Sequence, residues 1–179
     1  NYSQATVQPN FPISSVTEFE KELLNRYGFY IADQDDSIYF YAEECLGDVI
    51  EPVEDHLISE YAAKGDPIAV KLLEYIQEHG SDELDSYISS EFHWQYIFQE
   101  ILKKPECEGI EDICIEGAYT CDKHRPGELG GWVCRITRES VQSDGSSAAF
   151  ERMKKEPEFL AALDIVFAMA NGHILDQVD

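Results

Sequence analysis

The first half of the chain carries apolar residues at helical spacing and then in short runs typical of strands. Segment 15–18 has the form of a capping box, and apolar residues follow it at helical spacing until Gly28. Two aromatic and β-branched runs, 29–31 and 38–41, then flank the polar segment 33–37. This pattern predicts a helix that ends near Gly28, followed by a β-hairpin with a polar turn.

Three more helices are predicted between the first hairpin and residue 104. Asp66 and Pro67 form a cap and first-turn pair, and they open a predicted helix with an apolar stripe over 67–80. A second helix is predicted over 81–104, capped by its first residue, and a third over 52–63, opened by its proline.

The second half returns to strands. Two β-rich runs, 110–121 and 131–137, are joined by a long polar segment and predict a second hairpin, and helical periodicity reappears over 157–170. The order hairpin, helices, hairpin, helix lacks the alternation of strand and helix that marks a parallel sheet. We therefore predict an α+β fold, in which several helices pack on an antiparallel sheet built from two hairpins.

The N-terminal segment shows no periodicity. Residues 1–13 contain two prolines, and we expect them to form an arm or a lone edge strand. The remaining residues, 14–179, are predicted to form a single α+β domain, which is an ordinary size for one domain.

Charge is the unusual property of this chain. It has 36 Asp and Glu against 13 Lys and Arg, which gives a formal net charge of −23. Direct binding to nucleic acid or to an anionic membrane is not expected, because phosphate surfaces require Lys and Arg. No apolar run reaches the roughly 20 residues that cross a bilayer, and no signal peptide is recognisable. Five cysteines, an odd number, favour reduced thiols and a cytoplasmic location.

The carboxylates are concentrated in two stretches that contain no Lys or Arg. Ten lie between Arg26 and Lys64, and seven lie between Lys71 and Lys103. We predict that the partner-binding residues come from these stretches: Asp33, Asp35, Asp36, Glu43, Glu44, Asp48, Glu51, Glu54, Asp55, Glu74, Glu78, Asp82, Glu83 and Asp85.

Two interpretations of this acidity compete. One is a solvated surface that keeps the protein soluble, and the other is a surface that imitates the nucleic-acid backbone and occupies a basic groove. A compact chain of this size exposes roughly 9,000 Å², so the average net charge density is about fourfold below that of duplex DNA, which carries one charge per ~1.7 Å of axis. Mimicry therefore requires most of the seventeen carboxylates to share about a quarter of the surface.

In composition alone, the chain resembles the acidic proteins by which phages and plasmids block restriction and other nucleic-acid-handling enzymes. No motif carries this resemblance. We therefore predict a non-catalytic protein that presents a carboxylate-rich face to a basic protein surface. The most specific form of this prediction is a DNA-mimic inhibitor of a nucleic-acid-binding enzyme, of the anti-restriction or anti-defence type. Tyr30, Tyr39 and Tyr41 are candidates for the outward face of the first hairpin, where rings beside carboxylates suit a protein interface.

The alternative prediction is a small enzyme, or a binder of anions or small ligands, centred on the Cys121–Trp132 loop. Lys123, His124 and Arg125 lie together there beside glycines, in a pattern that can hold a phosphate or carboxylate. The structural interpretation of this segment is a long hairpin connection whose basic side chains pair with nearby carboxylates. No catalytic residue, cofactor or metal site is predicted: the cysteines do not form two close ligand pairs, and segment 33–44 lacks the glycine of a calcium loop.

Overall fold

The computed structural model describes residues 2–47, 53–120 and 129–155 of the chain. Contacts divide the chain into two compact units, residues 1–143 and residues 144–179. The single domain predicted over 14–179 stays a prediction, because most of the second unit lies outside the described residues. The helix predicted over 157–170 and the start of the helix predicted over 52–63 also lie outside them.

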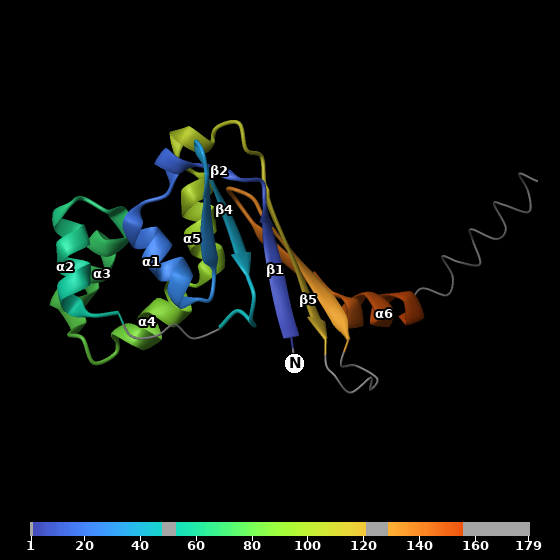
Figure 1. Ribbon diagram of the computed structural model, residues 1–179. Coiled ribbons are helices and arrows are strands. Elements are labelled where there is room, and N and C mark those ends of the chain that lie inside the picture. Colours follow the sequence, from blue (N-terminus) through green and yellow to red (C-terminus); the bar gives the residue numbers. More distant parts are fainter. Residues whose placement is uncertain (1, 48–52, 121–128, 156–179) are drawn as a thin grey trace, which may run out of the picture. The chain divides into compact units, whose positions relative to one another are not determined.

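A seven-stranded sheet organises the first unit (Figure 1). Strands β3 and β4 form the first predicted hairpin, and β5 and β6 form the second; both pairs are antiparallel, so both predicted hairpins are confirmed. The sheet runs β4, β1, β5, β6, β7, with β3 on the far side of β4. The strands are β1 Tyr2–Gln8, β2 Phe11–Pro12, β3 Tyr30–Gln34, β4 Ser37–Ala42, β5 Ile113–Thr120, β6 Gly130–Ile136 and β7 Val141–Gly145.

The N-terminal segment is not an arm or an edge strand, and this prediction was wrong. Strand β1 lies inside the sheet, where it pairs with β4 on one side and with β5 along its whole length on the other. After the break at Pro9 and Asn10, β2 continues along β4. The physical reason is a short alternation: Ala5 and Val7 are buried, while the residues between and beside them are exposed polar side chains, as suits a strand with one solvated face.

The helices of the first unit lie on one face of the sheet (Figure 1). They are α1 Glu18–Arg26, α2 Asp55–Ala63, α3 Pro67–His79, α4 Leu84–Glu91 and α5 Trp94–Leu102, with short 3₁₀ turns η1 Ile13–Ser15 and η2 Pro105–Cys107. A capping box opens α1, but it lies two residues after the predicted one over 15–18: Thr17 and Glu20 bond each other's backbone N–H groups, whereas the Ser15 hydroxyl donates to the Pro12 carbonyl. Asp66 caps α3 as predicted. The second unit contains α6, Ser146–Lys155.

The single helix predicted over 81–104 is two helices, α4 and α5. The chain leaves helical geometry at Phe92 and His93, and the His93 side chain accepts the N–H of Tyr96 to cap α5. The break buries Phe92 and Trp94, and the carbonyl of Phe92 accepts a buried hydrogen bond from the Tyr27 hydroxyl at 3.2 Å. Ser81 is not the cap of α4; its hydroxyl donates to Asp55 at the start of α2 instead.

Aromatic rings fill the core between α5 and the sheet. Phe98 of α5 contacts the rings of Phe11, Phe29 and Phe40, with centroids 5.2–5.9 Å apart, and all four side chains are buried. These contacts join β2, β4 and the start of the first hairpin to one helix. The predicted α+β class, with helices packed on an antiparallel sheet, is therefore confirmed.

Candidate functional site in the acidic helices

The described members of the predicted acidic set lie in three separate parts of the fold. Asp33, Asp35 and Asp36 lie at the turn of the first hairpin, whereas Glu43 and Glu44 follow the other end of β4. Six residues of strand separate these two groups by roughly 20 Å. The third and largest group lies on α2, α3 and α4. Asp48 and Glu51 lie outside the described residues.

We use the name acidic helices for residues 54–91, which comprise α2, α3 and α4. They contain ten acidic and two basic residues, which gives a net charge of −8. Helix α2 packs along α3, and α3 contacts α4. The hydrogen bond from Ser81 to Asp55, 2.5 Å long, ties the start of α4 to the start of α2. The group therefore belongs to one packed set of helices. Its predicted members are Glu54, Asp55, Glu74, Glu78, Asp82, Glu83 and Asp85.

The cations near the acidic helices are already engaged. Lys64 pairs with Glu60 at 2.6 Å, and Arg26 of α1 reaches Glu54 at 3.0 Å. Lys71 donates to the Tyr96 hydroxyl at 2.8 Å, and this hydrogen bond raises the pKa of Lys71.

Six exposed carboxylates of the acidic helices consequently have no ion-pair partner within the described residues. They extend over the outer part of α3 and over α4 and the turn before it. Such side chains repel one another and attract a positive surface over about a Debye length. They are Glu74, Glu78, Asp82, Glu83, Asp85 and Glu91.

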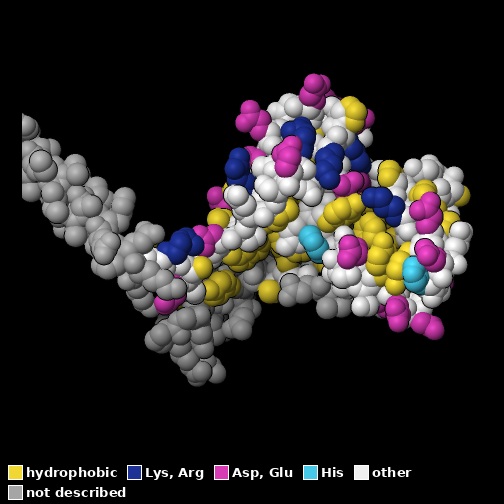
Figure 2. Space-filling view, turned by 180° about the vertical axis from the view of Figure 1, so that it is seen from behind, with side chains coloured by type: hydrophobic (Ala, Val, Ile, Leu, Met, Phe, Trp, Pro, Cys, Tyr) yellow, Lys and Arg dark blue, Asp and Glu magenta, His cyan; other side chains and the backbone are white. Residues whose placement is uncertain are grey.

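Stacked aromatic rings lie among these carboxylates. The rings of Tyr75 and Tyr87 are parallel, with centroids 3.8 Å apart, and His79 stacks on Tyr75 at 4.5 Å. Burial and the nearby Glu91 carboxylate raise the pKa of Tyr87. Figure 2 shows hydrophobic side chains on this side of the molecule with acidic side chains around them. This stack was not predicted from the sequence, because it depends on how α3 packs against α4.

The outward face of the sheet carries a second row of tyrosines, as the sequence predicts. The rings of Tyr30 and Tyr39 both stack on the ring of Tyr41, at centroid distances of 5.5 and 5.7 Å. No described helix of the first unit covers this face. The tyrosines thus form a half-exposed aromatic surface on the first hairpin, in which Tyr30 and Tyr41 pair at the end opposite the acidic turn.

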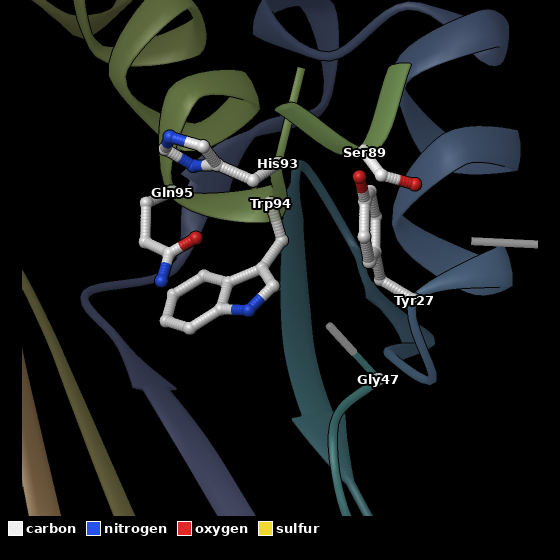
Figure 3. A pocket seen from close by; sticks show the side chains of 6 residues that line it. All are labelled: Tyr27, Gly47, Ser89, His93, Trp94 and Gln95. Atoms are coloured by element: carbon white, nitrogen blue, oxygen red, sulfur yellow. The ribbon is translucent and has the colours of Figure 1, made fainter. Parts of the chain in front are cut away.

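A small cavity of about 230 Å³ lies beside the break between α4 and α5, and Ser89, His93 and Tyr27 line it (Figure 3). Nδ1 of His93 accepts the N–H of Tyr96, so the proton of the neutral ring is on Nε2 and that nitrogen is a donor. Burial raises the pKa of Tyr27 to about 12, and its hydroxyl donates to Phe92. The Ser89 hydroxyl is buried and has no hydrogen-bond partner within the described residues.

The alternative site cannot be built from the described chain. Lys123, His124 and Arg125, with Cys121, lie outside the described residues. Four described cysteines are free thiols: Cys45, Cys107, Cys114 and Cys134. Among the described residues, no group of three or more His, Cys, Asp or Glu side chains is placed to hold a metal ion. None of the described helices has the length and apolar character needed to cross a membrane.

Comparisons with known proteins give no relative: no family model, curated protein or solved structure matches this chain.

Proposed function

We propose that this protein is a non-catalytic interaction protein that binds a basic protein surface through its acidic helices. The observation that carries the proposal is the set of six exposed carboxylates without ion-pair partners in the described chain, while the lysine among them, Lys71, is bonded to Tyr96. A folded surface that keeps so many unpaired like charges together tolerates self-repulsion that a basic partner relieves. The neighbouring Tyr75 and Tyr87 supply the rigid aromatic contact area that interfaces favour.

The partner class that fits this surface best is a protein whose basic groove otherwise holds a nucleic acid. Carboxylates on neighbouring helices offer such a groove the same sign of charge as a phosphate backbone. The three-part distribution of the acidic residues favours contact through the acidic helices alone rather than through a ridge that includes the hairpin. Binding by a protein of this kind blocks the groove, which makes inhibition of a nucleic-acid-binding enzyme the expected consequence.

Replacing Asp82, Glu83 and Asp85 together by Asn, Gln and Asn should slow association with the partner about tenfold and change dissociation less than threefold. Long-range charge acts on the encounter rate, whereas short-range packing sets the lifetime of the complex. The partner is captured from host lysate at 50 mM NaCl, released at 500 mM, and its binding kinetics are then measured by surface plasmon resonance. Capture alone decides nothing; the comparison of variants does.

A matched control removes the same charge elsewhere. Glu106, Glu108 and Glu111 are also exposed, and they lie at and after η2, away from the acidic helices. Their triple replacement by Gln should slow association less than twofold. Equal slowing by both triple variants would contradict the proposal and leave only a general charge effect. Duplex DNA should compete with this protein for the partner. Absence of such competition would exclude a nucleic-acid-binding protein as the partner.

A further inference from the structure

A cavity of about 290 Å³ lies where three helices of the first unit meet. It is bounded by the start of α1, the end of α2 and the start of α3, so it adjoins the acidic helices. This volume is at the small end of the range for ligand sites, and it suits a side chain better than a cofactor. The residues that line it include Thr17, Glu18, Tyr61, Lys64, Asp66 and Pro67.

Asp66 brings a half-satisfied carboxylate to this cavity. Its side chain is only 6% exposed, and its Oδ1 accepts the N–H groups of both Ile68 and Ala69 at 3.0 Å. Its Oδ2 is buried and has no hydrogen-bond donor within the described residues. A buried carboxylate charge is costly, so a cation that enters the cavity would gain more from Asp66 than from an exposed carboxylate.

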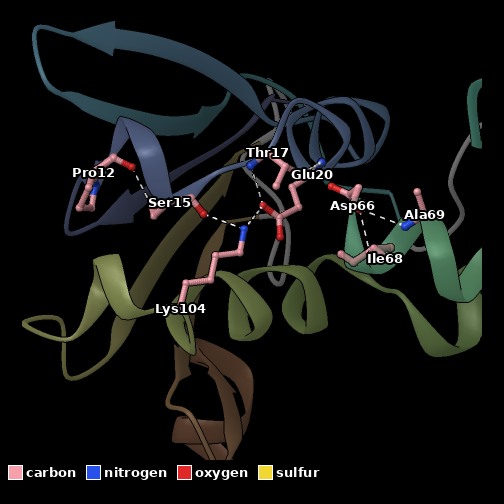
Figure 4. A network of polar contacts seen from close by, with 8 residues as sticks. All are labelled: Pro12, Ser15, Thr17, Glu20, Asp66, Ile68, Ala69 and Lys104. Atoms are coloured by element: carbon pink, nitrogen blue, oxygen red, sulfur yellow. Dashed lines mark hydrogen bonds and ion pairs between the residues drawn. The ribbon is translucent and has the colours of Figure 1, made fainter. Parts of the chain in front are cut away.

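The neighbouring charges leave this end of the cavity negative. Figure 4 shows Asp66 facing the start of α1, where Glu20 is also buried. Burial raises the pKa of Glu20, and the Asp66 carboxylate adds to the rise, whereas the bond to Lys104 lowers it. Lys104 donates to Glu20 at 2.6 Å and to the Ser15 carbonyl at 2.8 Å, so its charge is already used. Among the described residues, Lys104 is bonded to Glu20 and not to Asp66.

The remaining cation at the cavity does not neutralise Asp66. Lys64 is bonded to Glu60 at 2.6 Å and lies over the Tyr61 ring, 4.7 Å from its centroid. Lys64 therefore already covers one side of this ring. Tyr61 packs against the buried Phe19 ring at 5.1 Å, which fixes the ring as a wall.

We propose that this cavity binds a guanidinium group on an aliphatic stem, that is, an arginine side chain of the basic partner. The stem lies against Tyr61 and Pro67, where it takes the place of the Lys64 side chain, and the planar head lies near the Asp66 carboxylate. Glu18 and its ion-pair partner Lys21 are at the mouth. Guanidinium suits this combination because it stacks on aromatic rings and donates in a rigid fork. The source of the arginine rests on the proposed function, but the cation site itself does not.

The test uses N-acetyl-arginine amide as the probe and the amide signals of Gly65 and Ala69 in NMR titrations of the full chain. The wild-type protein should bind it at millimolar concentration, and N-acetyl-citrulline amide, which has the same shape without the charge, should bind at least tenfold more weakly. The variant Asp66→Asn keeps the oxygen that caps α3 and removes the charge, so it should fold and bind at least tenfold more weakly.

Glu108→Gln is the matched control, because Glu108 is an exposed carboxylate that lies after η2 and does not line the cavity. It should bind the probe within twofold of wild type. A second variant, Tyr61→Leu, keeps an apolar wall and should weaken binding severalfold. Absence of probe binding to wild type, or equal affinity in Asp66→Asn and wild type, would overturn the inference.

These outcomes are separable from those of the proposed function. The probe experiment needs no partner, and the triple variant of Asp82, Glu83 and Asp85 leaves the cavity intact. Slowed partner association in that triple variant, together with no probe binding, keeps the proposed function and removes the arginine site. Probe binding, together with an unchanged partner association rate in the triple variant, keeps the arginine site and removes the proposed function.

Discussion

Replacing Lys104 by methionine should lower the free energy of unfolding by about 3–5 kcal/mol at pH 7. Lys104 is the cation that faces Glu20, a carboxylate with only 2% of its side chain exposed. Removing one partner of a buried ion pair leaves the other charge buried and uncompensated, which costs several times more than the pair itself contributes. Methionine preserves most of the aliphatic packing of the lysine, so the loss reports the ammonium group, which pairs with Glu20 and donates to the Ser15 carbonyl. Urea denaturation followed by circular dichroism measures it.

The control for this variant is the neighbouring residue. Lys103 also forms an ion pair, with Glu100 at 2.7 Å, but that pair is partly exposed. Lys103→Met should therefore cost less than about 1 kcal/mol. A similar loss in both variants would show that the Glu20 pair is no more important than a surface pair.

The loss in Lys104→Met should shrink as the pH falls. Burial raises the pKa of Glu20 above its usual 4.5, so the folded protein binds this proton more readily than the unfolded chain does. The contribution of Glu20 to the free energy of unfolding consequently decreases as the pH rises from 4.5 through the raised pKa of Glu20. Without Lys104 the pKa rises further, because a cause that lowers it is gone. Compared with wild type at the same pH, the variant should be least affected near pH 4, where Glu20 is protonated. A loss independent of pH would contradict this account.

Replacing Gly117 by valine should lower the free energy of unfolding by about 3 kcal/mol. Gly117 of β5 lies opposite Trp132 of β6, and a Cβ at this position would lie 2.2 Å from the indole ring. Trp132 in turn contacts Trp94 at a centroid distance of 6.2 Å, so the indole has little room to withdraw. Inserting carbon atoms into a packed site forces side chains out of their rotamers, typically at a cost of 1–3 kcal/mol.

Ala118→Val provides the matched comparison in the next residue of the same strand. Its side chain is exposed on the other face of the sheet, so the added methyl groups meet solvent. This variant should change stability by less than about 0.5 kcal/mol. Tryptophan fluorescence adds a direct measurement, since displacement of the indole in Gly117→Val should shift its emission to longer wavelength. An unshifted spectrum together with wild-type stability would show that the ring does not lie across Gly117.

Much of the candidate site is visible in the sequence, but its organisation is not. The absence of Lys and Arg over long stretches predicts unpaired carboxylates, and six of them on the acidic helices are unpaired in the described chain. The engagement of Lys71 by Tyr96, 25 residues away, decides which carboxylates stay unpaired. The stack of Tyr75 on Tyr87 depends on how α3 packs against α4, which no local pattern encodes.

The sequence by itself determined the features that depend on neighbours along the chain. Helix periodicity, the cap at Asp66, both hairpins and the overall acidity are local, because turns and helix ends are satisfied by residues within four positions. Only the tertiary structure decided where these elements meet. The central place of β1, the break between α4 and α5, and the meeting of Asp66 and Glu20 with Lys104 join residues tens of positions apart. Burial in one shared core selects such pairings, since each element hides its apolar side only against a partner that is distant in sequence.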